Sequence, residues 1–219
     1  MIACNYIIVF LLGMAVGRFT GMKSRLYGDT PVAYPVTEVL TGILWCLTFL
    51  IVGWKWEAVF VCLLIPALIV ASATDRRMLK IPFGVNVFIF AIGLMQLVYV
   101  LYSDMVLKGA AGIARGQWYE YVTGFFAVSV PMYFIFAITK GHGIGGGDIK
   151  LMAAAGLLIG WKYAILALLA GGLYAGISHI VRMKISGEGR TFAMGPYLSA
   201  GILTAVWFGE EIIEWYLSY

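Results

Sequence analysis

Long apolar stretches separated by short polar segments are the dominant pattern along this chain. The stretches are continuously apolar rather than alternating, and a helix crosses the hydrocarbon core of a bilayer with about 20 residues. On this measure we expect eight membrane-spanning helices, at residues 2–16, 36–52, 58–74, 83–102, 121–139, 149–160, 164–183 and 196–208. The sixth is short for a full crossing, so seven spans with one partial or re-entrant helix are the alternative.

The composition agrees with this pattern. Of 219 residues, 62% are hydrophobic and 12% are charged, which leaves too little polar surface to cover a soluble globule. Backbone groups inside lipid need internal hydrogen-bond partners, and continuous apolar runs favour helices over a β-barrel. We therefore predict an all-α, polytopic membrane helical bundle that forms a single membrane-embedded domain over residues 1–219, in contact with the lipid bilayer.

The basic residues of the loops predict the orientation of the bundle. Cytoplasmic loops carry an excess of Lys and Arg. Eleven of the fifteen basic residues fall in one set of loops: Arg18, Lys23, Arg25, Arg76, Arg77, Lys80, Lys140, Lys150, Arg182, Lys184 and Arg190. The other set holds only Lys55, Lys108, Arg115 and Lys162. The first set is therefore expected in the cytoplasm, with the N- and C-termini outside.

Two classes of binding function are not expected. No run of basic residues with interleaved aromatics indicates nucleic-acid binding. The three cysteines, Cys4, Cys46 and Cys62, lie inside apolar runs without paired spacing, so they indicate neither a zinc cluster nor a disulfide framework.

A glycine-rich stretch before the sixth span contains the first candidate for chemistry. Five of the seven residues 141–147 are glycine, and Asp148 follows where a new helix begins. Glycine lets the backbone turn sharply and lets another chain approach closely. Asp148 is therefore either a helix cap, because Asp accepts hydrogen bonds from free amides at a helix start, or one member of a catalytic pair.

A second acid is expected at the same membrane face. Asp75 closes the third span on its cytoplasmic side, and Asp148 opens the sixth span on that side. A charge at membrane depth is costly, so such residues are commonly functional. The alternative for Asp75 is a salt bridge with Arg76 or Arg77 at the headgroups.

Two neighbouring carboxyl groups supply a complete set of groups for peptide hydrolysis. They cannot both ionise easily, so they share one proton. The ionised member can take a proton from water while the neutral member hydrogen bonds the scissile carbonyl. This chemistry needs no metal and no covalent intermediate.

Other hydrolytic chemistries have poorer support. Ser178 and His179 are adjacent, and adjacent residues on a helix do not face each other. Ser186 near Lys184 lies in a polar loop without shielding. His142 and His179 are the only histidines, whereas a zinc site wants at least three ligands, so no metal site is expected.

Four stretches together resemble one known family. Gly145-Gly146-Gly147-Asp148 matches the Gly-x-Gly-Asp signature of intramembrane-type aspartic proteases. Asp75 followed by Ile81-Pro82, the segment 34–42 (Tyr-Pro-Val-Thr-Glu-Val-Leu-Thr-Gly) and the segment 194–198 (Met-Gly-Pro-Tyr-Leu) are similar to the corresponding motifs of type IV prepilin peptidases. Presenilin-like proteases place their aspartates on successive spans, whereas here two further spans intervene.

The resemblance implies a multi-pass protease of the bacterial plasma (inner) membrane with its active site at the cytoplasmic face. Its substrates would be type IV prepilins or related pseudopilins, cut between a short basic leader and the hydrophobic helix of the mature subunit. Asp75 and Asp148 would be catalytic, without a cofactor. Residues expected to bind substrate or support the motifs are Gly145, Gly146, Gly147, Glu38, Lys150 and Pro196.

One departure from the family concerns a second activity. Many bacterial members carry two Cys-x-x-Cys pairs in the first cytoplasmic loop and also methylate the new N-terminus, but no cysteine lies between Arg18 and Pro35. This argues against methylation, and S-adenosylmethionine is expected as a cofactor only where methylation is retained. Glu38, associated with that neighbourhood, is equally well explained as a helix-start acid paired with loop arginines.

Two other functions stay open from the sequence. The first is a small proton- or cation-coupled transporter in which Asp75 and Asp148 act at a broken helix. The second is a non-catalytic assembly factor for a pilus or secretion apparatus. The position of both acids at the cytoplasmic edge, rather than near the midplane, argues against a transporter.

Overall fold

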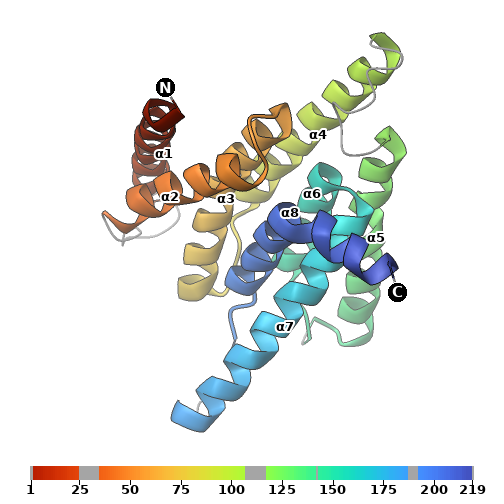
Figure 1. Cartoon of the computed structure of the whole chain (residues 1–219). Helices are drawn as coiled ribbons and strands as arrows, with labels where there is room; N and C mark the ends of the chain where they lie inside the picture. Colours follow the sequence, from red (N-terminus) through yellow and green to blue (C-terminus); the bar gives the residue numbers. More distant parts are fainter. Residues whose placement is uncertain (1, 25–34, 107–116, 142, 187–191, 219) are drawn as a thin grey trace.

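The computed structural model describes residues 2–24, 35–106, 117–141, 143–186 and 192–218. Within these ranges the chain forms eight α-helices and no strand, which confirms the predicted all-helical class (Figure 1). The helices are α1 (Ile2–Ser24), α2 (Val36–Ile51), α3 (Trp56–Met78), α4 (Phe83–Val106), α5 (Trp118–Ile138), α6 (Gly146–Ile159), α7 (Trp161–Ser186) and α8 (Gly195–Leu217).

Five of these helices, α1, α3, α4, α5 and α7, are long and apolar enough to cross a membrane, which confirms a polytopic membrane protein. Of the other three helices, α2 has 16 residues and α6 has only 14, while three glutamates, Glu210, Glu211 and Glu214, lie near the end of α8. Several helices also run past their expected ends, α8 from residue 208 to Leu217. The length of an apolar run underestimates the length of the helix, because the terminal turns reach polar surroundings where charged side chains are stable.

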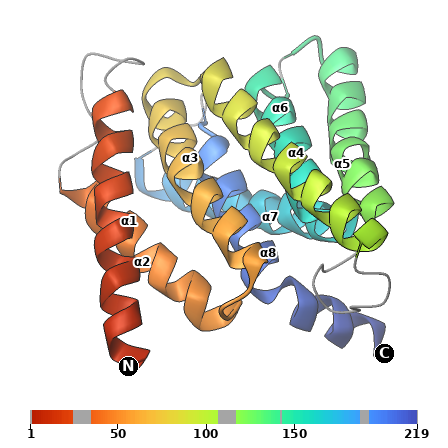
Figure 2. The same cartoon turned by 90° about the horizontal axis from the view of Figure 1, so that it is seen from above.

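Both termini lie at the same edge of the bundle (Figure 2). At the opposite edge α3 ends and α4 and α6 begin, and a hydrogen bond joins the first residue of α8 to Asp75 near the end of α3. The arrangement agrees with the even number of helices and with the predicted alternation of loops. That the termini face the exterior stays a prediction from the distribution of basic residues.

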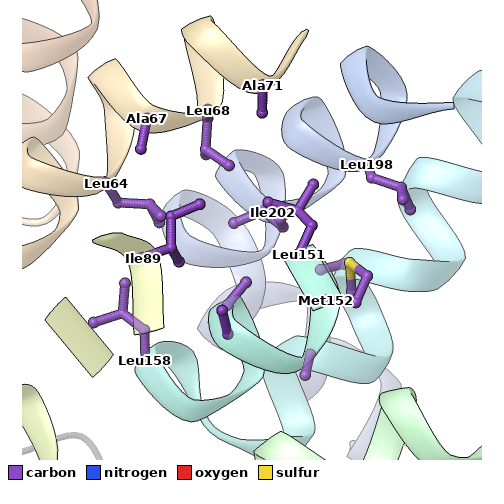
Figure 3. Close-up of a cluster of buried hydrophobic side chains, with 14 of the residues drawn as sticks. Leu64, Ala67, Leu68, Ala71, Ile89, Leu151, Met152, Leu158, Leu198 and Ile202 are labelled. Atoms are coloured by element: carbon purple, nitrogen blue, oxygen red, sulfur yellow. The ribbon is translucent and has the colours of Figure 1, made fainter. Parts of the chain in front are cut away.

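Helix α6 occupies the centre of the bundle and packs against α4, α5, α7 and α8. Every residue from Leu151 to Leu158 is buried. Figure 3 shows Leu151 and Met152 of α6 among Leu64 and Leu68 of α3 and Ile202 of α8. Lipid tails are as apolar as these side chains, so the cluster is held by close van der Waals packing rather than by removal of apolar surface from water.

Small residues allow the closest of these helix contacts. A Cβ atom added to Gly124 of α5 would overlap the carbonyl oxygen of Gly156 of α6, and one added to Gly156 would overlap the carbonyl of Gly124. Two helices can approach so closely only where neither has a side chain. This pair therefore fixes α6 against α5, with Asp148 at the start of α6.

The connection from α3 to α4 turns sharply just after Asp75. Leu79 adopts the left-handed conformation (φ 53°), and its amide closes the helix by bonding the carbonyl of Asp75. The chain then returns through Ile81, whose side chain is buried against the bundle, and α4 begins at Phe83. The turn keeps the end of α3 close to the start of α6.

Candidate active site

Asp75 lies in the last turn of α3 and points into the bundle. Only 5% of the residue is exposed, whereas its neighbours Arg76 and Arg77 are exposed. The carboxylate oxygen Oδ2 accepts a hydrogen bond of 2.7 Å from the main-chain N–H of Gly195. A backbone amide is thus the hydrogen-bond donor that the structure describes for Asp75.

Gly195 is the first residue of α8, and the amides at a helix start have no partner within their own helix. Asp75 supplies the missing acceptor from another helix. A Cβ atom at position 195 would stand 2.9 Å from Oδ2 of Asp75, closer than real Cβ contacts, and 3.0 Å from its Cβ, which is tighter than most. Pro196, expected to support the motif, is the next residue, where the lack of an N–H costs nothing.

Asp148 is the third residue of α6 and is buried, with 7% exposed. Its carboxylate accepts a hydrogen bond from the Gly145 amide, the residue that precedes the helix. This is the reach-back contact by which an acid in the first turn caps a helix. Its other oxygen, Oδ1, is buried and has no hydrogen-bond partner among the described residues. Asp148 therefore caps α6 and still presents a free acceptor.

The two acids belong to one cluster. Asp75 and Asp148 are close enough for their charges to interact. The α3–α4 connection brings them together, because a Cβ atom at Gly147 would lie 3.2 Å from Cβ of Ile81. The sequence thus correctly anticipated that both carboxyl groups reach one end of the bundle.

Asn86 of α4 is a further polar residue of this cluster, and sequence reasoning missed it. It is 5% exposed, and its Nδ2 donates a hydrogen bond of 3.5 Å to the carbonyl of Gly147, directly before Asp148. A carbonyl only accepts, so this contact fixes the amide with Oδ1 facing away. Oδ1 is buried without a partner among the described residues. The available signal was one amide side chain near the start of an apolar span.

The three glycines of the Gly-x-Gly-Asp stretch meet different surroundings. A Cβ atom at Gly145 would lie 2.8 Å from Oδ2 of Asp148, and one at Gly147 would press on Ile81. A Cβ atom at Gly146 would meet no heavy atom within 4 Å outside its own helix backbone. Gly145 and Gly147 are therefore required by close contacts, whereas Gly146 is not.

Two predicted site residues have described contacts with residues other than the two acids. Lys150 is exposed, and its Nζ lies 5.5 Å from the ring centroid of Phe83. Glu38 is buried on α2, where its Oε2 accepts a 3.2 Å hydrogen bond from Thr37 Oγ1 and its backbone packs against Gly17 of α1. No contact described for either residue joins it to Asp75 or Asp148.

The alternative serine site finds no support in these contacts. The Ser178 hydroxyl lies 2.5 Å from the hydroxyl of Tyr197, and the His179 ring packs edge-on against Phe192. Neither residue forms a nucleophile–base pair with the other. Several residues used in the sequence arguments lie outside the described residues or carry undescribed side chains, namely Lys23, Arg25, Tyr34, Lys108, Arg115, His142, Ser186 and Arg190.

Fold and site together define a polytopic helical membrane protein with a buried pair of acids at one end of the bundle. The chain belongs to the type IV leader peptidase family, whose profile it matches over residues 62–180. This range includes both aspartates, and membership supports a peptidase function.

Individual relatives cover nearly the whole chain. A prepilin leader peptidase/N-methyltransferase of Legionella pneumophila is 29% identical over 90% of this chain and 68% of its own length. The protein of the same name from Bacillus subtilis is 29% identical over 84% of this chain and 69% of its own length. The one from Aeromonas salmonicida is 27% identical over 98% and 72%. No solved structure matches this chain.

Proposed function

We propose that this chain is an aspartic endopeptidase that removes the basic leader of type IV prepilins or pseudopilins at the cytoplasmic face of the bacterial plasma membrane. The observation that carries the proposal is the meeting of Asp75 and Asp148, two buried acids, at the end of the bundle where the basic loops gather. The names of the relatives supply the substrate class. One chain forms the domain, and neither metal nor cofactor takes part in cleavage.

The reaction uses one proton shared by the two acids. The ionised carboxylate takes a proton from water, and the resulting hydroxide attacks the scissile carbonyl carbon. The protonated carboxyl donates a hydrogen bond and then its proton toward the carbonyl oxygen, giving a neutral tetrahedral intermediate. Collapse of this intermediate breaks the C–N bond, with one proton passing to the leaving nitrogen. The products are the leader with a free carboxyl group and the mature subunit with a free amine.

Charge and shape support a basic leader as the substrate. The acid cluster attracts positive charge, while the side chains of Arg76, Arg77 and Lys80 are exposed rather than buried with it. The lack of a side chain at Gly145 lets a substrate backbone approach Asp148 closely. An acid pair at the cytoplasmic edge suits a cut just before a membrane helix better than it suits ion transport through the midplane.

Co-expression with a candidate prepilin tests the proposal. We expect the wild type to convert the prepilin to a shorter product, seen by gel shift and by sequencing of the new N-terminus. Asp75→Ala and Asp148→Ala are each expected to abolish conversion while inserting at normal levels. Substantial cleavage by either variant would refute the two-aspartate mechanism.

Methylation of the product is the second activity to be tested, because the relatives are named for it as well. Glu38 is buried on α2 away from the described contacts of the acids, and the loop between Arg18 and Pro35 has no cysteine. We propose cleavage without methylation. Transfer of label from S-adenosylmethionine to the mature subunit by the purified protein would contradict this part of the proposal.

A further inference from the structure

A groove runs along the outer surface of α3, between α2 and α8. Its volume is about 310 Å³. Leu40 and Leu44 of α2 line one wall, Ile69 and Ala73 of α3 form the floor, and Ala200 and Leu203 of α8 line the other wall. The lining is mostly apolar, as expected of a surface in contact with lipid.

One end of this groove adjoins the acid cluster. Arg76 and Pro196 line this end, and they directly follow Asp75 and Gly195, the two residues joined by the 2.7 Å hydrogen bond. The groove therefore ends beside the candidate active site, although neither Asp75 nor Asp148 is part of its lining.

A side-chain contact joins α2 and α8 beyond the other end of the groove. The indole Nε1 of Trp207 in α8 donates a 3.2 Å hydrogen bond to Oγ1 of Thr48 in α2, one turn beyond the outermost lining residues. Between this contact and Arg76 the floor extends from Ile65 to Arg76, about 16 Å or three turns of helix. The groove thus accommodates a short helical segment that begins at the acids.

We propose that this groove binds the first turns of the apolar helix of the prepilin substrate, with the bond to be cut presented to Asp75 and Asp148. The inference rests on the proposed peptidase function and adds where the membrane part of the substrate docks. Cleavage just before an apolar helix requires that helix to lie with one end at the acids, and the groove is a mostly apolar surface that ends beside them.

Two features favour a helix with one end at the acids over a lipid chain as the occupant of the groove. Ala73 and Ala200, with Ser72 and Ser199, give the cytoplasmic half of the groove a small-residue lining, which lets a second helix approach closely. Arg76 at the mouth repels a basic leader, so only the apolar side of the cut site enters. The occupant is therefore held in one direction.

Crosslinking tests the docking directly. Cys4, Cys46 and Cys62 are replaced by Ser or Ala in an Asp75→Asn background, and a single cysteine is placed at Ala73 or Ala200. The matched control is Ala91, an exposed alanine of α4 that does not line the groove. We expect disulfides between the groove positions and a cysteine in the first turns of the prepilin helix, and none at position 91. Equal crosslinking at position 91, or none in the groove while prepilin co-purifies, would overturn the proposal.

Kinetics give an independent measure. Ala200→Trp and Ala73→Trp fill the groove and are expected to raise KM for prepilin in proteoliposomes by about tenfold with kcat little changed. Ala91→Trp should match the wild type. If the Trp variants bind and cleave prepilin normally, the groove holds only lipid and the proposal fails. If groove crosslinks form but the wild type cuts no prepilin, docking stands and the peptidase function fails instead.

Discussion

The main-chain N–H of Gly195 donates a hydrogen bond to Oδ2 of Asp75 at 2.7 Å, joining the first residue of α8 to the last turn of α3. The contact satisfies an amide that α8 cannot satisfy itself, and the positive end of the α8 dipole favours the carboxylate. One of the two candidate catalytic acids is therefore also a structural element of the bundle.

Replacement of Asp75 is expected to separate activity from stability. Asp75→Ala leaves the Gly195 amide buried without an acceptor, which should cost about 1–3 kcal/mol. Asp75→Asn keeps an acceptor oxygen and should retain nearly the wild-type Tm in detergent, although neither variant cleaves because an amide is no base. Thermal unfolding with the gel-shift assay checks both statements. Equal loss of Tm in the two variants would show that the hydrogen bond contributes little.

Gly195→Ala should impair cleavage while Asp75 is unchanged. The added methyl group would stand 2.9 Å from Oδ2, so the carboxylate must move from its position. A displacement of this size is expected to lower kcat by about 100-fold with a smaller change in KM. Gly172→Ala on α7, where an added Cβ meets open space, is the control and should behave as wild type. Normal kcat in Gly195→Ala would remove the positioning role of this residue.

The Gly-x-Gly-Asp stretch should tolerate substitution at one position and not at another. Gly145→Ala puts a methyl group 2.8 Å from Oδ2 of Asp148 and is expected to reduce cleavage strongly with little loss of stability, because the affected atom ends a side chain. Gly146→Ala meets open space in the first turn of α6 and should keep activity, with stability unchanged or raised by about 0.5–1 kcal/mol. Cleavage rates and Tm of the two variants test this prediction. Equal inactivation of both variants would contradict the described geometry.

Asn86 is expected to influence the reaction through the start of α6. Asn86→Leu removes the donor to the Gly147 carbonyl and should lower kcat by about tenfold or more. Gln96→Met is the control, since Gln96 is another buried amide of α4 with an unpartnered carbonyl oxygen but lies almost three turns away from Asn86. Measured kcat and KM for both variants test this. A loss of equal size in Gln96→Met would mean that the effect of Asn86 is general to the packing of α4.

The pairing of Asp75 with Asp148 was predictable because it depends only on which helix ends share a face. The count of apolar runs and the distribution of basic residues determine that face. The positions of Lys150 and Glu38 depend instead on how each helix is rotated about its axis. Helices that are apolar on all sides carry no polar stripe that reveals this rotation, so only the packed structure shows that Lys150 is exposed beside Phe83 and that Glu38 is buried beside Thr37.

The site also depends on backbone groups whose roles the sequence does not reveal. The Gly195 amide and the Gly147 carbonyl organise the site, and neither differs chemically from any other peptide group in the sequence. The segment 194–198 was recognisable as a motif, but its contact with Asp75 requires α8 to begin beside the end of α3. Helix length was similarly underestimated, because charged terminal turns such as that of α3 continue the helix beyond its apolar run.

The short length of α6 determines how the acids meet water. Its 14 residues extend about 21 Å, roughly 9 Å less than the hydrocarbon core. If the Trp161 ring that follows lies at one membrane interface, Asp148 sits below the opposite surface of a bilayer of ordinary thickness. Protein covers α6 from Leu151 to Leu158, so lipid need not thin to match it. In the proposed reaction, water would have to reach Asp148 past the neighbouring helix ends, so hydration of this end of the bundle would itself contribute to the rate of cleavage.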